Sequence, residues 1–253
     1  LQGGGDVEQS TVASVVRIND QAGIYDSDNG RTYIINRVLQ DPTNSVYSVL
    51  QTHSAYSRFF ELLNGNDRVF KMFENDAEIR AIFSLNRTST SSGLGQVVTA
   101  FKNFRYTVWV PSNDAIDEAF RNDANLHTWD EIDAQDNADT KRLWTIHLLR
   151  FLNYHFMDNS VYADGLTRTQ EQYETAARND NGKFQSLTVS SDGNNLSITD
   201  GHGNTAQVIK TNGLYNIQAR DMIVNNSDYT KATQLISSSF SVIHLISKAM
   251  LPE

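Results

Sequence analysis

Two regions of the chain alternate between hydrophobic and polar residues, the pattern of β-strands with one buried face. Residues 11–18 and 31–39 are rich in β-branched residues, and the turn between them ends in Asn29-Gly30, a strong hairpin signal. We expect two antiparallel strands there. From Lys183 onward, Asp-Gly and Asn-Gly turns separate four short alternating segments, FQSLTV, NLSIT, TAQVI and LYNIQA. They predict an antiparallel meander.

Hydrophobic residues at three- and four-residue spacing predict two amphipathic helices. The first lies within residues 43–63, with Asn44 or Ser45 as its N-cap. The second covers residues 138–157 and should lie on the core. Its wide apolar face consists of Leu143, Trp144, His147, Leu148, Phe151, Leu152, Tyr154 and His155.

Residues 104–120, FRYTVWVPSNDAIDEAF, join an aromatic and β-branched strand to a short helix at Pro111. We expect Ser112 or Asn113 to cap this helix. Asn113 and Asp114 are placed to accept hydrogen bonds from the first helical amides, an interaction worth about 1 kcal/mol. We interpret Pro111, Asn113 and Asp114 as structural residues.

The rest of the chain gives weaker signals. Residues 86–95, NRTSTSSGLG, indicate an exposed insertion. The last 27 residues, from Ser227 onward, predict a short helical stretch and then a final apolar strand, VIHLI, at 242–246. Helices and antiparallel strands in this order indicate one α+β unit.

An internal repeat relates the two ends of the chain. RTYIINRVL at 31–39 matches VIHLISKAM at 242–250 in character, at a spacing of about one domain length. The paired hydrophobic positions are Ile34 with Leu245 and Ile35 with Ile246. We therefore expect residues 1–41 to be the C-terminal strands of a preceding module, and residues 42–253 to form a second, complete module.

Three motifs of this chain resemble the fasciclin domain family. TVWVPSNDAIDEAF at 107–120 is similar to the first signature box of the family, and SVIHLISKAMLP at 241–252 is similar to the second. LLRFLNYHFMDNSVYADG at 148–165 resembles the central helix with its Tyr-His element. The resemblance covers most of residues 42–253.

The resemblance implies an α+β fold, a β-wedge of about seven strands with helices packed along one side. It also implies a secreted or surface-anchored adhesion module, frequently in tandem, with no reaction. The chain departs from the family pattern at Trp109, where Phe is more usual, and in the longer polar stretches 64–100 and 166–182. Modules of this kind resemble those of Bacteroidetes-type surface lipoproteins, which implies outer-membrane anchoring if the chain is bacterial.

The resemblance also points to candidate residues. The Tyr-His element is linked to integrin contact in animal members, which makes Tyr154 and His155 a possible adhesion element, with core packing as the alternative. His244, inside VIHLI, matches a family histidine that forms hydrogen bonds within the fold.

The composition of the chain argues against several classes of function. Lys and Arg number 21 against 30 Asp and Glu, and the resulting net charge of −9 disfavours a nucleic-acid partner. Cysteine is absent, which excludes disulfides and thiolate chemistry. Apolar runs are far shorter than the roughly 20 residues that span a bilayer. Because no GxSxG, phosphate-loop or HExxH motif occurs, we expect no enzyme and no cofactor.

Metal binding has weak candidates only. His147 and His155 share a helix face, and the turns at Asp192 and Asp200 gather carboxylates and amides. We interpret the histidines as buried structural residues and the turns as plain hairpin turns, so no metal site is expected. Calcium at the turns stays open.

The leading hypothesis is an extracellular or cell-surface module that binds a protein or glycan partner through its loops. The alternative is a structural spacer, with a neighbouring module as its only partner. A carbohydrate-processing enzyme would need an aromatic groove with converging carboxylates. An exposed cluster of Trp129, Tyr162 and Tyr173 would favour binding over spacing.

Overall fold

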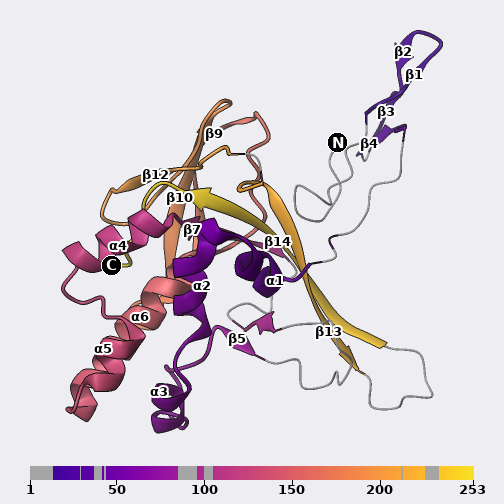
Figure 1. The fold of residues 1–253 in the computed structure, drawn as a ribbon. Coiled ribbons are helices and arrows are strands. Elements are labelled where there is room, and N and C mark those ends of the chain that lie inside the picture. The colour runs from indigo at the N-terminus through magenta and orange to yellow at the C-terminus, as the bar shows by residue number, and fades with distance from the viewer. Residues whose placement is uncertain are drawn as a thin grey trace.

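The computed structural model describes residues 14–28, 30–36, 42, 44–84, 96–99, 105–211, 213–225 and 234–253. Eight strands form the main sheet, in the order β12-β11-β10-β9-β8-β7-β14-β13 (Figure 1). They are β7 (Arg105–Pro111), β8 (Phe156–Asp158), β9 (Thr167–Arg178), β10 (Phe184–Asp192), β11 (Leu196–Thr199), β12 (Thr205–Gln207), β13 (Ile217–Asn225) and β14 (Gln234–Ile246). β14 pairs with β7 in parallel, and the other neighbours pair antiparallel.

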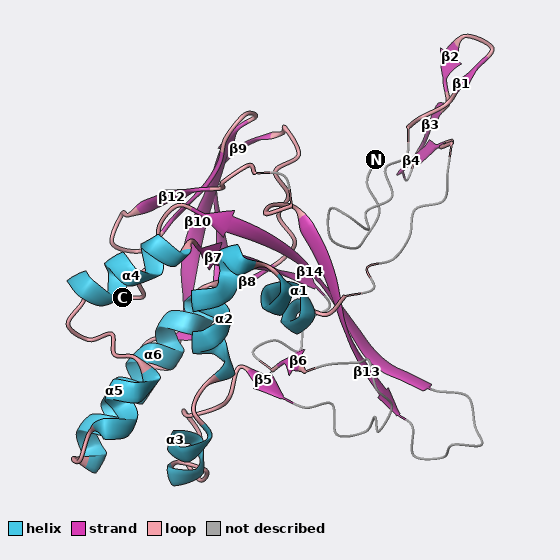
Figure 2. Cartoon of the chain, in the orientation of Figure 1, coloured by secondary structure: helices cyan, strands magenta, loops and turns pink. Residues whose placement is uncertain are grey.

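Helices gather along one side of this sheet (Figure 2). They are α1 (Val46–Thr52), α2 (Ser57–Asn64), α3 (Asp67–Met72), α4 (Asn113–Asn122), α5 (Trp129–Ala134) and α6 (Ala138–Tyr154). This arrangement confirms the predicted α+β fold, with eight strands in the sheet where about seven were expected. The apolar face of α6 is narrower than predicted, because Leu143 is 50% exposed.

The sheet separates two hydrophobic cores. Successive side chains of a strand point to opposite faces, so Val108 of β7 packs in the first core and Trp109 in the second. The first core lies between the helices and the strands β7, β8, β13 and β14. The second is formed by the curled half of the sheet and contains Leu187 and Ile198. β9 to β12 thus cover a second core, to which β7, β8 and β14 also contribute.

The helix predicted within residues 43–63 is broken at His53. Ser45, and not Asn44, caps α1 with its side chain. His53 has an extended backbone, with φ −99° and ψ 117°. A single 3₁₀ turn, Ser54–Tyr56, then leads into α2. The hydrophobic spacing continues across the break, so periodicity alone did not reveal it.

Two stretches form strands that the sequence patterns did not predict. β9 occupies most of the polar stretch 166–182, and its side chains are mostly exposed. β14 begins at Gln234, so the predicted helical stretch is wrong for residues 234–241. Residues 226–233 lie outside the described part of the chain. Pairing with β13 along this length stabilises β14 as a strand.

Residues 14–36 form two short hairpins where one was predicted. Their strands are β1 (Arg17–Ile18), β2 (Gln21–Ala22), β3 (Ile24–Ser27) and β4 (Gly30–Tyr33). Among their described residues, the two predicted strands meet at a single bridge between Val15 and Ile35. Figure 1 shows the hairpins apart from the main sheet.

A small sheet of β5 (Phe83–Ser84) and β6 (Val97–Val98) lies between α3 and β7 in sequence. The tract 86–95, predicted to be an exposed insertion, falls outside the described residues. Within the described part of the chain, no helix is long and apolar enough to cross a membrane.

Candidate functional site

Tyr154 ends α6 and packs in the second core, where only 1% of the residue is exposed. Its hydroxyl donates to the carbonyl oxygen of Ser186 at 2.9 Å and accepts the amide of Gly201 at 3.3 Å. Burial raises the pKa of Tyr154 to about 12, so the hydroxyl remains protonated. The side chain joins α6 to β10 and to the turn after β11.

His155 follows Tyr154 and is fully buried. Its Nδ1 lies 2.9 Å from the carbonyl oxygen of Phe151, and its Nε2 lies 3.1 Å from the amide of Met250. A carbonyl only accepts and an amide only donates, so Nδ1 carries the proton. Burial lowers the pKa of His155 to about 4. The neutral ring joins α6 to the C-terminal segment.

His244 has a matching environment in β14. Its Nε2 donates to the carbonyl oxygen of Val161 at 2.8 Å, and its Nδ1 accepts the amide of Asn216 at 3.4 Å. The ring stacks on Trp109, with centroids 5.0 Å apart and planes inclined by 21°. Burial lowers the pKa of His244 to about 4. Both ring nitrogens are therefore used inside the fold.

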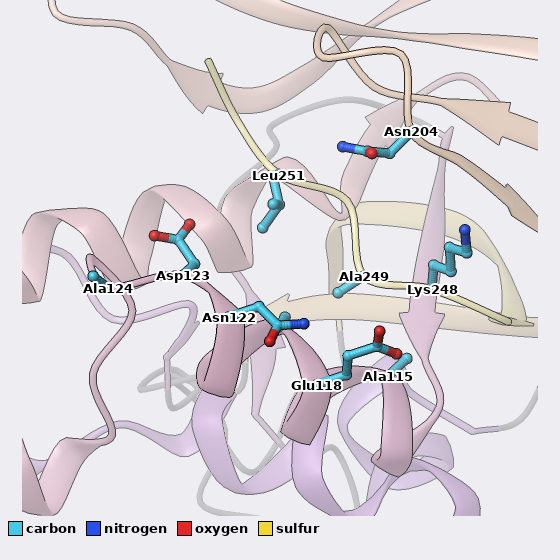
Figure 3. A pocket seen from close by; sticks show the side chains of 10 residues that line it. Ala115, Glu118, Asn122, Asp123, Ala124, Asn204, Lys248, Ala249 and Leu251 are labelled. Atoms are coloured by element: carbon cyan, nitrogen blue, oxygen red, sulfur yellow. The ribbon is translucent and has the colours of Figure 1, made fainter.

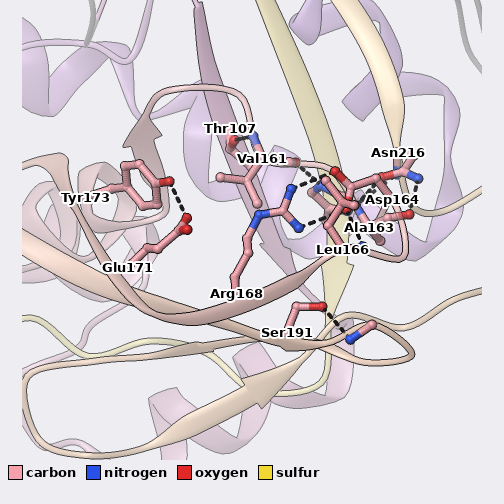
Figure 4. Close-up of polar contacts among 12 residues, drawn as sticks. Thr107, Val161, Ala163, Asp164, Leu166, Arg168, Glu171, Tyr173, Ser191 and Asn216 are labelled. Atoms are coloured by element: carbon pink, nitrogen blue, oxygen red, sulfur yellow. Dashed lines mark hydrogen bonds and ion pairs between the residues drawn. The ribbon is translucent and has the colours of Figure 1, made fainter.

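The segment 159–166, between β8 and β9, is anchored by side chains of neighbouring elements (Figure 4). Thr107 Oγ1 donates to the carbonyl oxygen of Asn159 at 2.7 Å and accepts the amide of Val161 at 2.9 Å. Two further anchors are Asn216 with the backbone of Ala163, and the ion pair of Asp164 with Arg168. The segment therefore has a defined position beside the start of β9.

Pro111 is the last residue of β7, and Ser112 is the N-cap of α4. Asn113 does not cap its own helix, because its Oδ1 accepts the amide of Arg58 in the first turn of α2, at 3.1 Å. Asp114 lies in the first turn of α4, where the helix dipole favours a carboxylate. Asn113 thus joins the starts of two helices that lie far apart in sequence.

One hollow, with a cavity volume of about 360 Å³, lies between α4 and the C-terminal segment. Figure 3 shows Glu118 and Asn122 of α4 and, across the hollow, Lys248 and Leu251. Alanines make up much of the remaining lining. The hollow has opposite charges on its two sides and few groups that could orient a ligand.

Two larger hollows follow the face of β9 to β12 that points away from the second core. The first, about 460 Å³, is lined in part by Gln172, Thr188 and Thr199. The second, about 650 Å³, is lined in part by Ser190 and Ser197. Thr188 and Ser190 lie two residues apart on β10 and face the same way. The two hollows are therefore neighbours on one polar face.

The metal candidates do not come together in one site. His147 is partly buried, which lowers its pKa, and its Nδ1 has no hydrogen-bond partner among the described residues. Both nitrogens of His155 are occupied. The carboxylates of Asp192 and Asp200 accept hydrogen bonds from backbone amides in or beside their own turns. Across the described ranges, no three His, Asp or Glu side chains converge on a metal-sized site.

Trp129, Tyr162 and Tyr173, whose exposed clustering would favour binding over spacing, do not form an exposed cluster. Trp129 is buried, and its Nε1 donates to the carbonyl oxygen of Leu62 at 2.8 Å. Tyr173 packs partly against the second core, and the hydroxyl of Tyr162 accepts from Gln218 at 3.3 Å. Trp129 therefore belongs to the core, and its ring contributes no exposed aromatic surface.

A family model for the fasciclin domain matches residues 84–252. The chain belongs to the fasciclin domain family. Among curated proteins, the comparison finds no match. The matched residues run from β5 to the C-terminal segment and include Tyr154, His155 and His244. Fasciclin domains are generally adhesion and binding modules, typically extracellular or at the cell surface, and are known as non-catalytic.

The polar face of this fasciclin domain was missed by sequence reasoning. Gln172 lies on β9, which was not recognised as a strand, so no pattern placed it beside Thr188 and Thr199. A usable signal was present in FQSLTV and NLSIT, where Ser and Thr alternate with buried Leu, Val and Ile. That alternation defines one apolar face and one hydroxyl face.

Proposed function

We propose that this fasciclin domain is an extracellular or cell-surface adhesion module that binds a protein or glycan partner without catalysis. Its contact surface is the polar face of β9 to β12. The observation that carries the proposal is the pair of neighbouring hollows on this face. The side chains of Gln172, Thr188 and Gln207 line them and form no hydrogen bond with any other described residue. They are available to a partner.

In this proposal, Tyr154 and His155 lie below the adhesion surface and hold its residues in position. Both are buried, so a partner would reach little of either side chain. The hydroxyl of Tyr154 bonds to Ser186 and Gly201, and both of these residues line the first hollow. The Tyr-His element is thus a positioning element for the surface.

The N-terminal hairpins support a tandem arrangement, with residues 1–41 as the closing strands of a preceding fasciclin-like module. Ile34 of the hairpins is 38% exposed, whereas its repeat counterpart Leu245 is 5% exposed. Leu245 is covered because β14 lies between β7 and β13 and packs against the helices. A neighbouring module would cover Ile34 in the same way, in a surface lipoprotein that is outer-membrane anchored if bacterial.

The competing function is a spacer without its own ligand. The lack of an exposed cluster among Trp129, Tyr162 and Tyr173 favours this alternative, because large aromatic side chains dominate most protein interfaces. The two functions differ in whether the isolated chain binds anything.

A binding screen separates the two. The chain is immobilised and exposed to extracellular-matrix proteins and to neutral and charged glycans, and each signal is titrated to saturation. A saturable partner that is lost with Ser190→Arg, but retained with Ser54→Arg in the turn before α2, supports the proposal. Saturable binding to no partner would establish the spacer.

A further inference from the structure

The cross-strand register brings a row of hydroxyl and amide side chains together on the polar face. Thr188 of β10 lies opposite Gln172 of β9 on one side and Thr199 of β11 on the other. Thr199 in turn lies opposite Thr205 of β12, with their Oγ1 atoms 2.9 Å apart. Four strands at about 4.8 Å spacing give a row about 14 Å long.

A second row runs parallel to the first, two residues along each strand. Ser190 lies opposite Ser197, which lies opposite Gln207. The rows are about 7 Å apart, because a strand rises about 3.3 Å per residue. We infer that this two-row grid binds a neutral polysaccharide chain laid across β9 to β12, an assignment that rests on the proposed binding function.

The chemistry of the grid fits sugar hydroxyls. A sugar hydroxyl both donates and accepts, and so do the hydroxyls of Thr and Ser and the amide of Gln. Phe184 lines the first hollow and is 43% exposed, which offers an apolar surface for the C–H face of a sugar ring. The Arg178 guanidinium lies 3.8 Å from the ring centroid and fixes the ring in place.

The charges of the face disfavour an anionic polymer. Arg168, the cation in the lining of the second hollow, is paired with Asp164 at 2.6 and 2.9 Å. Arg178, beside the first hollow, stacks on Phe184 and donates to the carbonyl oxygen of Gly182 at 2.7 Å. Acidic groups remain at the edges, namely Glu253 in the first hollow and Glu174 opposite Ser186. Together with the net charge of −9, they repel sulfated or uronic-acid chains.

A protein partner is disfavoured by the same lining. Protein interfaces depend on a few buried Trp, Tyr or Arg anchors, and the grid offers Ser, Thr and Gln in their place. Its polar groups would be desolvated by an apolar partner without compensation.

Native gels that contain soluble β-glucan, α-mannan or xyloglucan test the inference, with heparin, alginate and matrix-protein surfaces as comparisons. The test variant is Gln172→Ala with Thr188→Val, which keeps the β-branched shape on β10. The matched control is Gln51→Ala with Thr32→Val, at exposed positions of α1 and β4. Thermal unfolding of both variants checks that they are folded.

We expect at least one neutral polysaccharide to retard the wild-type chain. The test variant should bind about 10-fold more weakly, since two hydrogen-bonding groups are lost, and the control should bind as the wild type does. Binding only to heparin, alginate or a protein would overturn the polysaccharide assignment and leave the proposed function standing. Equal binding by wild type and test variant would also overturn it. If the wild-type chain binds none of the polysaccharides and none of the protein surfaces, both the polysaccharide assignment and the proposed binding function would be overturned.

Discussion

His155 and His244 lie in different elements, and each is held as a neutral imidazole. In each ring, one nitrogen donates to a backbone carbonyl and the other accepts a backbone amide. Only the neutral imidazole can form both bonds. A proton added to either ring would have to displace an amide donor in a site without water access.

Because of these two histidines, we expect the free energy of unfolding to fall at acidic pH. Their pKa values are about 4 in the folded chain, against an ordinary value of about 6.5. Between these values the unfolded chain binds protons that the folded chain does not, so the free energy of unfolding falls as pH drops from 6.5 towards 4. Above pH 6.5 the full stability is present. Each histidine contributes up to about 3 kcal/mol to this loss.

Urea denaturation from pH 7 to pH 4.5 checks this. His155→Gln should reduce the slope of unfolding free energy against pH by up to about 1.4 kcal/mol per pH unit. His202→Gln, at an exposed turn, is the control. Asp221 has the opposite effect on the pH dependence of stability. Burial raises its pKa, so as pH falls the folded chain binds this proton before the unfolded chain does, which stabilises the folded state. An unchanged slope in His155→Gln would show that the ring is accessible to protons in the native state.

At the scale of elements, Asn113 couples α4 to α2. Its side chain accepts the amide of Arg58 and donates to the carbonyl oxygen of Ser54. Asn113→Ala should therefore lower the free energy of unfolding by about 1–2 kcal/mol. Asn122→Ala, at the exposed end of α4, should have little effect. Denaturant midpoints of the two variants test this, and equal losses would refute the coupling.

The elements also show what sequence patterns can resolve. β7 and α4 were predicted because an apolar strand, Pro111 and a capping serine are local signals. β9 was missed because its first half is polar on both faces, so it lacks the alternation of a half-buried strand. The register that assembles Gln172, Thr188 and Thr199 depends on long-range pairing, which no local pattern encodes.

For the whole molecule, the fold class and the family followed from motifs, whereas the contact surface did not. Motifs report residues that the core needs, such as His155 and His244. A binding face of Ser, Thr and Gln has the composition of any solvent-exposed strand face. It becomes distinctive only after the sheet has brought four strands into register.

The tandem proposal predicts uneven protection in the isolated 253-residue chain. Backbone amides of β4 should exchange with deuterium at least roughly 100-fold faster than those of residues 242–246 in β14, because the described side chains of β4 and of its partner strand β3 are exposed. Hydrogen-exchange mass spectrometry provides both rates. Comparable protection of β4 and β14 would place residues 14–36 within this domain.

The most direct test of the account is chemical-shift mapping on the isotope-labelled chain during titration with glucan, mannan and xyloglucan oligosaccharides in turn. A binding module that uses the polar face predicts saturable shifts at Gln172, Thr188 and Thr199, with the hollow at Glu118 and Lys248 unchanged. Shifts confined to that other hollow, or no shift with any of the three sugars, would contradict the account.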